Sequence, residues 1–162
     1  MDEASALSVS DRRTLREVEP RDLAAWCALR EALWPDEDAL IMARDAREYF
    51  ERTRKKIAFL AFDAADVAIG FAEATIRSDY VNGTETSPVG FLEGLYVAPT
   101  HRRRGIGRAL VAAVELWVRE QLCSEIASDA WLDNKESHLA HHAYGFVETE
   151  RVVYFRKSLD AR

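Results

Sequence analysis

The stretch that decides the fold is YVAPTHRRRGIG, residues 96–107. It begins at the end of an apolar run typical of a β-strand, and Ala98 and Pro99 stop that run. From Ile106 to about residue 122, apolar residues recur at three- and four-residue steps, which predicts an amphipathic helix. A strand that passes through a short loop into a helix presents unpaired backbone N–H groups at the positive end of that helix. The stretch therefore predicts a site for a phosphate-bearing ligand.

The glycines and arginines of the stretch strengthen this prediction. Gly105 and Gly107 allow an anion to approach the backbone closely, and Arg102, Arg103 and Arg104 add charge-assisted contacts. The loop lacks the Gly-Lys-Ser/Thr ending of a Walker loop and the third glycine of a dinucleotide fingerprint. By charge alone it is equally typical of an exposed basic turn or a short nucleic-acid patch. The strand-loop-helix context favours the phosphate site.

The hydropathy pattern outside this stretch alternates between the strand period and the helical period. We expect strands over residues 15–18, 57–62, 67–77, 89–97, 124–131, 146–149 and 152–156. We expect helices over residues 23–33, 40–55, 106–122 and 134–145, the first capped by Asp22 and the last by Asp133 or Asn134. No long linker interrupts this order. The prediction is one mixed α/β (α+β) domain over residues 14–162, after a flexible extension over residues 1–13.

Composition excludes several classes of protein. The 162 residues are 48% apolar, which is too much for a disordered chain, and no run approaches the ~20 apolar residues of a membrane span. The N-terminus has no secretory signal pattern, so we expect a cytoplasmic protein. With 28 acidic and 22 basic side chains, the net charge of −6 argues against general binding to nucleic acid or to an anionic membrane. It leaves open whether the protein attracts a cation.

The loop residues identify a resemblance to a known family. Arg102-x-x-Gly105-x-Gly107, after a strand that ends in Val97-x-Pro99, resembles the acyl-coenzyme A loop of the GCN5-related N-acetyltransferases. That resemblance implies a central, mostly antiparallel mixed sheet, splayed at the acyl-CoA site and flanked by helices. Further segments are similar to the chromosomal-type aminoglycoside 6'-N-acetyltransferases of Gram-negative bacteria, namely residues 33–35, 79–89, 91–94, 127–129 and 148–152.

The resemblance implies an activity and a donor site. The expected reaction is transfer of an acetyl group from acetyl-CoA to the 6'-amine of an aminoglycoside, which gives antibiotic resistance. Backbone groups of the strand end would pair with the pantetheine arm, one N–H would polarise the thioester carbonyl, and the loop would hold the pyrophosphate. The implied donor-site residues are Leu95, Tyr96, Val97, Arg102, Arg103, Arg104, Gly105, Ile106, Gly107, Arg108 and Asn134.

Two carboxylates interrupt apolar strand runs. A carboxylate in such a run either faces a pocket or is poorly solvated, so Asp129 and Glu93 are candidate site residues. Asp129 is the candidate base that takes the proton of the acceptor amine. Glu93 is a candidate acceptor contact, with a structural ion pair to an arginine as the alternative.

The resemblance also assigns Trp34, Tyr80 and Glu150 to the acceptor site. Trp34 and Tyr80 are equally consistent with core aromatics. Close relatives exchange their C-terminal region between subunits, so Glu150 is expected to complete the pocket of a partner in a homodimer. The acidic run at residues 36–38 is a solvated helix entrance by default, or else a rim that attracts substrate.

The chain departs from the family pattern at His141. Many members have a tyrosine there, seven residues after the asparagine, to protonate the leaving thiolate. Either His141 acts as this acid, or no side chain does. His138, His141 and His142 have helical metal-ligand spacing but no accompanying ligands, so we expect no metal. An acetyltransferase for another cationic amine (a polyamine or a peptide) and a catalytically silent CoA-binding module remain alternatives.

Overall fold

The computed structural model describes residues 13–51 and 55–159. The chain divides into two compact units, residues 1–129 and 130–162, which we describe separately. Most of the predicted N-terminal extension lies outside the described residues, and the single domain over residues 14–162 stays a prediction. Among the described residues, no helix is both long enough and apolar enough to cross a membrane.

The first unit is built on one five-stranded sheet in the order β1-β2-β3-β4-β5. The strands are β1 (Thr14–Glu17), β2 (Lys56–Phe62), β3 (Ala68–Arg77), β4 (Val89–Val97) and β5 (Ile126–Ser128). The first four are antiparallel neighbours, whereas β5 runs parallel to β4. The mixed, mostly antiparallel sheet that we predicted is therefore confirmed.

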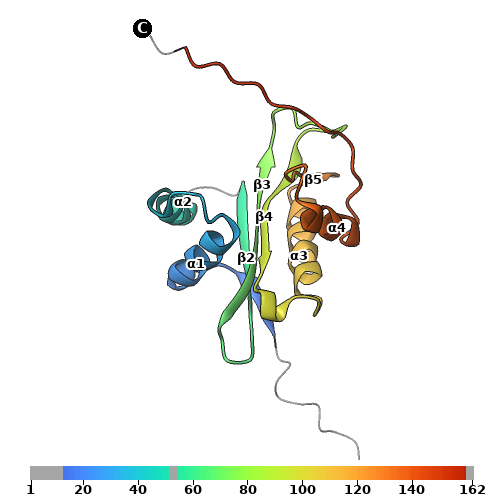
Figure 1. The fold of residues 1–162 in the computed structure, drawn as a ribbon. Coiled ribbons are helices and arrows are strands. Elements are labelled where there is room, and N and C mark those ends of the chain that lie inside the picture. Colours follow the sequence, from blue (N-terminus) through green and yellow to red (C-terminus); the bar gives the residue numbers. More distant parts are fainter. Residues whose placement is uncertain (1–12, 52–54, 160–162) are drawn as a thin grey trace, which may run out of the picture. The chain divides into compact units, whose positions relative to one another are not determined.

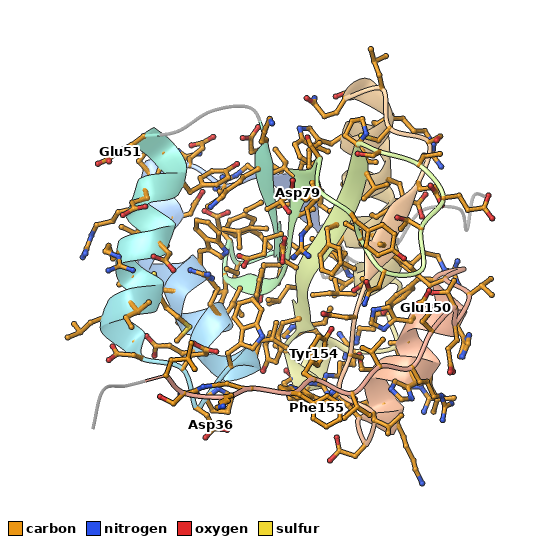
Figure 2. All side chains as sticks on the ribbon, turned by 90° about the horizontal axis from the view of Figure 1, so that it is seen from above. Asp36, Glu51, Asp79, Glu150, Tyr154 and Phe155 are labelled. Carbon is orange, nitrogen blue, oxygen red and sulfur yellow. The ribbon has the colours of Figure 1, made fainter. Side chains whose placement is uncertain are left out.

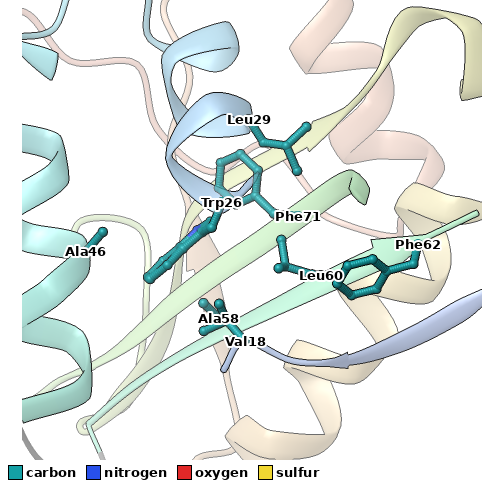
Figure 3. Close-up of a cluster of buried hydrophobic side chains, with 8 residues drawn as sticks. All are labelled: Val18, Trp26, Leu29, Ala46, Ala58, Leu60, Phe62 and Phe71. Carbon is teal, nitrogen blue, oxygen red and sulfur yellow. The ribbon is translucent and has the colours of Figure 1, made fainter. Parts of the chain in front are cut away.

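Helices cover both faces of this sheet. Helices α1 (Leu23–Leu33) and α2 (Ala39–Glu51) lie on one face, and α3 (Ile106–Glu120) lies on the other (Figure 1). Figure 3 shows the core beneath α1 and α2, where Trp26 and Leu29 of α1 pack with Leu60 and Phe71 of the sheet. Helix α2 is described as far as Glu51, and residues 52–54 of the helix predicted to end near Lys55 lie outside the described residues.

Asp22 occupies the predicted N-cap position of α1, but its side chain does not cap the helix. The Asp22 side chain makes no capping hydrogen bond to α1 and instead accepts bonds from the Arg16 guanidinium, at 2.6 and 2.9 Å. It also accepts the backbone N–H of Glu19 at 2.8 Å. The ion pair with a buried carboxylate outcompetes the helix N–H groups because a charged donor makes the stronger bond.

Strand β4 continues beyond the end of β5. Only Gly90, Phe91 and Leu92 pair with β5, so the predicted strand over residues 124–131 is reduced to Ile126–Ser128. A bulge lies just beyond this pairing: Ala74 of β3 pairs with Leu92, whereas Glu73 pairs with Gly94, which leaves one extra residue on β4. A bulge bends its strand, and here it follows directly after the last pair with β5. Beyond Leu92, β4 thus continues without β5 beside it, and the predicted splay of the sheet stays a prediction.

The second unit contains α4 (Lys135–Ala143). Asn134 caps this helix, as predicted, because its side-chain oxygen accepts the N–H of Ser137 at 3.0 Å. The two predicted strands over residues 146–149 and 152–156 are wrong, since no strand follows α4 in the described residues. Val153, Tyr154 and Phe155 are at least 77% exposed. A strand requires hydrogen-bonding partners, and this segment finds none within the described residues of its unit.

Candidate active site

The end of β4 carries backbone groups that no neighbouring strand uses. The N–H of Ala98 donates to the carbonyl of Ile69 at 2.8 Å. Because backbone groups alternate in direction along a strand, those of Leu95 and Val97 point away from β3, toward the edge that β5 does not reach. On this edge the Val97 carbonyl accepts the Nε–H of Arg102 at 2.9 Å. The edge can pair with an extended ligand as a sixth strand would.

The loop after β4 leads into the N-terminus of α3. A short 3-10 helix (Pro99–His101) precedes it, and Arg103 and Gly105 then adopt positive φ angles of 61° and 79°. The first intrahelical bond of α3 runs from Ala109 to the Gly105 carbonyl at 3.0 Å, so the N–H groups of Ile106 and Gly107 have no acceptor within the helix. These donors, at the positive helix end, suit a phosphate group.

The surroundings of this helix start are open and positively charged. A Cβ built on Gly105 would meet nothing within 4 Å. Arg102, Arg103, Arg104 and Arg108 are all exposed. Within the described part of the chain, the guanidinium groups of Arg103 and Arg104 form no ion pair or hydrogen bond. The predicted donor-site residues of the first unit thus gather around the end of β4 and the start of α3.

Glu93 lies at the bulge of β4 and is held by two residues of β3. Its carboxylate accepts hydrogen bonds from Arg77 at 2.8 and 2.9 Å and from the Thr75 hydroxyl at 2.5 Å. The guanidinium of Arg77 also lies over the Phe91 ring, 3.4 Å from its centre. The ion pair with an arginine, given above as the alternative for Glu93, is therefore present, and the carboxylate remains partly exposed.

The two predicted aromatic contacts differ in burial. Trp34 is half-buried, with its ring centre 6.0 Å from that of Phe71. Tyr80 is 78% exposed, so the reading of this residue as a core aromatic was wrong. It lines a cleft of about 540 Å³ together with Lys55, Ile76, Arg77, Ser78, Asp79 and Val81.

The predicted base is placed differently from expectation, whereas the acidic run agrees with its default interpretation. Asp129 is exposed and follows the last residue of β5, so its expected position in mid-strand was wrong. Of the acidic run at residues 36–38, Asp38 caps α2, because its side chain accepts the N–H groups of Leu40 and Ile41 at 2.8 and 3.3 Å. This contact agrees with the helix-entrance interpretation of the run.

Three predicted residues belong to the second unit. Asn134 uses its side-chain oxygen to cap α4. The Nδ1 of His141 lies 2.7 Å from the carbonyl oxygen of Ser137. This oxygen can only accept a hydrogen bond, so Nδ1 carries a proton. In the neutral imidazole, Nε2 is then the ring nitrogen without a proton. Glu150 is exposed and lies on the extended C-terminal segment that also carries Tyr154 and Phe155 (Figure 2).

Two features near the site escaped prediction from the sequence. Arg30 and Glu73 form a buried ion pair between α1 and β3. The signal was available, because Glu73 interrupts an apolar strand in the same way as Glu93 does. Glu125 accepts the N–H groups of Glu85 and Thr86 and thereby holds the loop that carries Tyr80. Those contacts depend on tertiary structure and leave no pattern in the sequence.

The titratable side chains of the described residues form no group of three or more His, Cys, Asp or Glu that could hold a metal ion.

Comparisons with known proteins match this arrangement. Residues 23–146 match the acetyltransferase (GNAT) family. The chain is 48% identical to an aminoglycoside N(6')-acetyltransferase type 1 of Stenotrophomonas maltophilia over 94% of its own length and 97% of that protein. AAC(6')-Iy, solved with a bisubstrate analogue of CoA and acetylneamine, superposes with a TM-score of 0.86 at 42% identity, covering 91% of this chain and 99% of that one. AAC(6')-Ih from Acinetobacter baumannii gives a TM-score of 0.86 at 44% identity, with coverages of 92% and 100%.

Proposed function

Because the chain belongs to the acetyltransferase (GNAT) family, we propose that it transfers the acetyl group of acetyl-CoA to the 6'-amine of aminoglycosides. The observation that carries this proposal is the 48% identity, over nearly the whole of both chains, to an enzyme named for that reaction. The family match over residues 23–146 spans the loop at residues 102–107 and the carboxylates Glu93 and Asp129. Resistance to these antibiotics follows if the modified amine is one that the drug needs.

The open edge of β4 and the start of α3 suit the donor. Acetyl-CoA supplies a thioester, which an amine attacks with departure of a thiolate. The backbone groups of Leu95 and Val97 would pair with the pantetheine arm, and one of these N–H groups would stabilise negative charge on the carbonyl oxygen. The N–H groups of Ile106 and Gly107, with Arg103 and Arg104, would hold the pyrophosphate.

The carboxylates of the first unit suit a polycationic acceptor. The amine arrives protonated and becomes a nucleophile only after it loses a proton. Asp129 is exposed at the end of β5 and would take this proton, directly or through water. Glu93 would contact an ammonium group of the acceptor, with Trp34 and Tyr80 as aromatic contacts.

His141 is suited to act as an acid only in its charged form. Nδ1 donates to the Ser137 carbonyl at 2.7 Å, so Nε2 can donate a proton only when the ring is an imidazolium. The departing group is a thiolate, which is a weak enough base to leave without first being protonated. We therefore assign His141 an auxiliary role, with Asp129 as the residue on which the rate depends.

We further propose a homodimer in which the C-terminal segment pairs with the partner. The segment carries the consecutive apolar residues Val152 to Phe155, and its side chains are largely exposed. Such a run is stable when it is buried against another surface. Glu150 would then complete the acceptor pocket of the partner. Light scattering is expected to give twice the mass of one chain, and a mass of one chain would contradict the dimer.

The experiment that tests the function is an acceptor panel. Thiol release from acetyl-CoA is measured with kanamycin, tobramycin, spermidine and a lysine-containing peptide. We expect the highest kcat/KM with the aminoglycosides. A higher value with spermidine or the peptide would favour the alternative amines, and CoA binding without thiol release with any acceptor would favour a silent binding module.

Because acetyl-CoA is an intracellular metabolite, we propose that the enzyme acts in the cytoplasm.

A further inference from the structure

A buried ion pair lies beneath the proposed acceptor site and has no role in the chemistry described above. The Nε of Arg30, in the last turn of α1, is 3.3 Å from Oε2 of Glu73 on β3. The two side chains are only 13% and 14% exposed. Glu73 is adjacent to the bulge, since it pairs with Gly94 immediately after Glu93. The ion pair therefore lies at the point where β4 leaves β5.

The geometry of this pair is poor for stability. Neither Arg30 Nε nor Glu73 Oε2 forms a well-directed hydrogen bond, and both atoms are buried. Removing two charges from water costs free energy that only excellent geometry offsets, so an apolar pair of similar volume would often stabilise a fold equally well. Stability alone is thus a weak account of a charged pair at this place.

The guanidinium of Arg30 is instead arranged to fix Trp34. It lies 5.5 Å from the centre of the Trp34 ring and 5.4 Å from that of Trp26, which is cation–π distance on both sides. Its Nη1 donates to the Met42 carbonyl of α2 at 2.9 Å. The backbone N–H of Trp34 donates to the Arg30 carbonyl at 2.8 Å. Arg30 therefore contacts Trp34 through both its side chain and its backbone.

The Trp34 ring rests on the backbone of β4. A Cβ built on Gly94 would lie 2.6 Å from Cη2 and 2.8 Å from Cζ2 of this ring, closer than any side chain allows. The ring is thus held between Arg30 and a glycine that directly follows Glu93. Because the ring is only half-buried, part of it stays accessible to solvent.

We propose that Glu73 is a positioning residue: by holding Arg30 it fixes the Trp34 ring in the orientation that contacts the cationic acceptor next to Glu93. This inference rests on the proposed function, since it concerns the affinity of the same acceptor site. Glu73 touches no reacting atom and acts through Arg30. The expected consequence is an effect on acceptor KM that exceeds the effect on kcat, because the ring contacts the acceptor similarly before and during the reaction.

The test compares two buried carboxylates. Glu73→Gln removes the charge that holds Arg30, and we expect the KM for tobramycin to rise about five- to ten-fold while kcat changes less than about two-fold. The matched control is Asp22→Asn, which breaks the other buried ion pair of this unit, Arg16–Asp22 at 2.6 Å. The control is expected to lose stability but to keep its KM. A rise in KM that is the same in both variants, or absent from a folded Glu73→Gln, would overturn the proposal.

A double-mutant cycle on KM distinguishes a positioning role of Glu73 from a purely structural one. If Glu73 acts through the Trp34 ring, Glu73→Gln has no further effect on KM in a Trp34→Ala background. Additive effects would overturn the proposal. Should Glu73→Gln fail to fold, the apolar pair Arg30→Met with Glu73→Leu removes both charges together and is expected to raise KM to the same extent. An unmodified chain that acetylates no aminoglycoside overturns both the function and this inference, whereas an active chain with an unchanged variant overturns the inference alone.

Discussion

Arg77 donates from Nη2 to both carboxylate oxygens of Glu93, at 2.8 and 2.9 Å, so the carboxylate expected to bind a cationic acceptor already holds a cation. An ammonium group that reaches Glu93 must share this carboxylate with Arg77. The pair is partly exposed, at 39% and 29%, so water screens it and the arginine can yield part of the contact to a ligand.

The first prediction concerns Glu93→Gln. The change leaves Arg77 without its carboxylate, which turns an attractive site for an ammonium group into a repulsive one. We expect the KM for tobramycin to rise about ten-fold, equivalent to about 1.4 kcal/mol of binding. Glu115→Gln is the matched control, because it breaks an exposed pair with Arg119 on α3 and should change KM by less than about two-fold. The KM values are measured by steady-state kinetics with varied tobramycin. An unchanged KM in Glu93→Gln would refute the contact between Glu93 and the acceptor.

The second prediction concerns Asp129→Asn. An amide of the same shape cannot take a proton from the acceptor amine, so kcat is expected to fall about 10²- to 10⁴-fold. CoA affinity, measured by calorimetry, is expected to stay the same. Asp133→Asn provides the control, since Asp133 is a second exposed carboxylate a few residues further on. A kcat that survives in Asp129→Asn would assign the base to another group.

The third prediction concerns the backbone at Gly105. With φ at +79°, alanine there is strained by about 1–2 kcal/mol, although its Cβ would meet nothing. The strain displaces the N–H groups at the start of α3, so CoA should bind more weakly. Gly145→Ala is a close control, because Gly145 has φ of +96° and also faces open space. Calorimetry should show weaker CoA binding only for Gly105→Ala, and equal affinities in the two variants would contradict this phosphate site.

The fourth prediction follows from the burial of Glu73. Burial raises the pKa of Glu73 from 4.5 to about 7, while Arg30 and Lys56 act to lower it and Glu93 to raise it further. Between about pH 4.5 and 7 the folded state therefore holds a proton that the unfolded state has released, and above about pH 7 the Glu73 carboxylate is charged and pairs with Arg30. The stabilising contribution of this proton is complete below pH 4.5 and is lost as the pH rises through about 7. Urea unfolding between pH 5 and 8 should show this loss in the unmodified chain but not in Glu73→Gln. Parallel pH profiles of the two proteins would contradict it.

Local patterns allowed much of the fold to be predicted. The helix over residues 106–120 follows from its apolar period, and the strand over residues 89–97 from its apolar run and the proline that stops it. The C-terminal strands were wrong because Val152 to Phe155 carry strand propensity without a hydrogen-bonding partner in the described chain. Propensity is local, whereas a strand exists only when another strand pairs with it.

The site could be predicted in part for a similar reason. The loop at residues 102–107 is contiguous, so its phosphate-binding geometry is visible in the sequence. The partners of Glu93 and Glu73 come from other elements, and they depend on the register of β3 against β4 and on the bulge between them. A shift of one residue would exchange the faces on which these side chains lie. The sequence therefore indicates which carboxylates are unusual but not which arginines they meet.

Acetyl transfer to the 6'-amine is tested with two acceptors that differ only at the 6' position. Neomycin carries an amine there and paromomycin a hydroxyl. Thiol release from acetyl-CoA is followed with each, and the site of acetylation on neomycin is read from the NMR spectrum of the product. We expect turnover with neomycin, acetylation at the 6'-amine and no turnover with paromomycin. Equal turnover with both acceptors, or acetylation of neomycin at another amine, would contradict it.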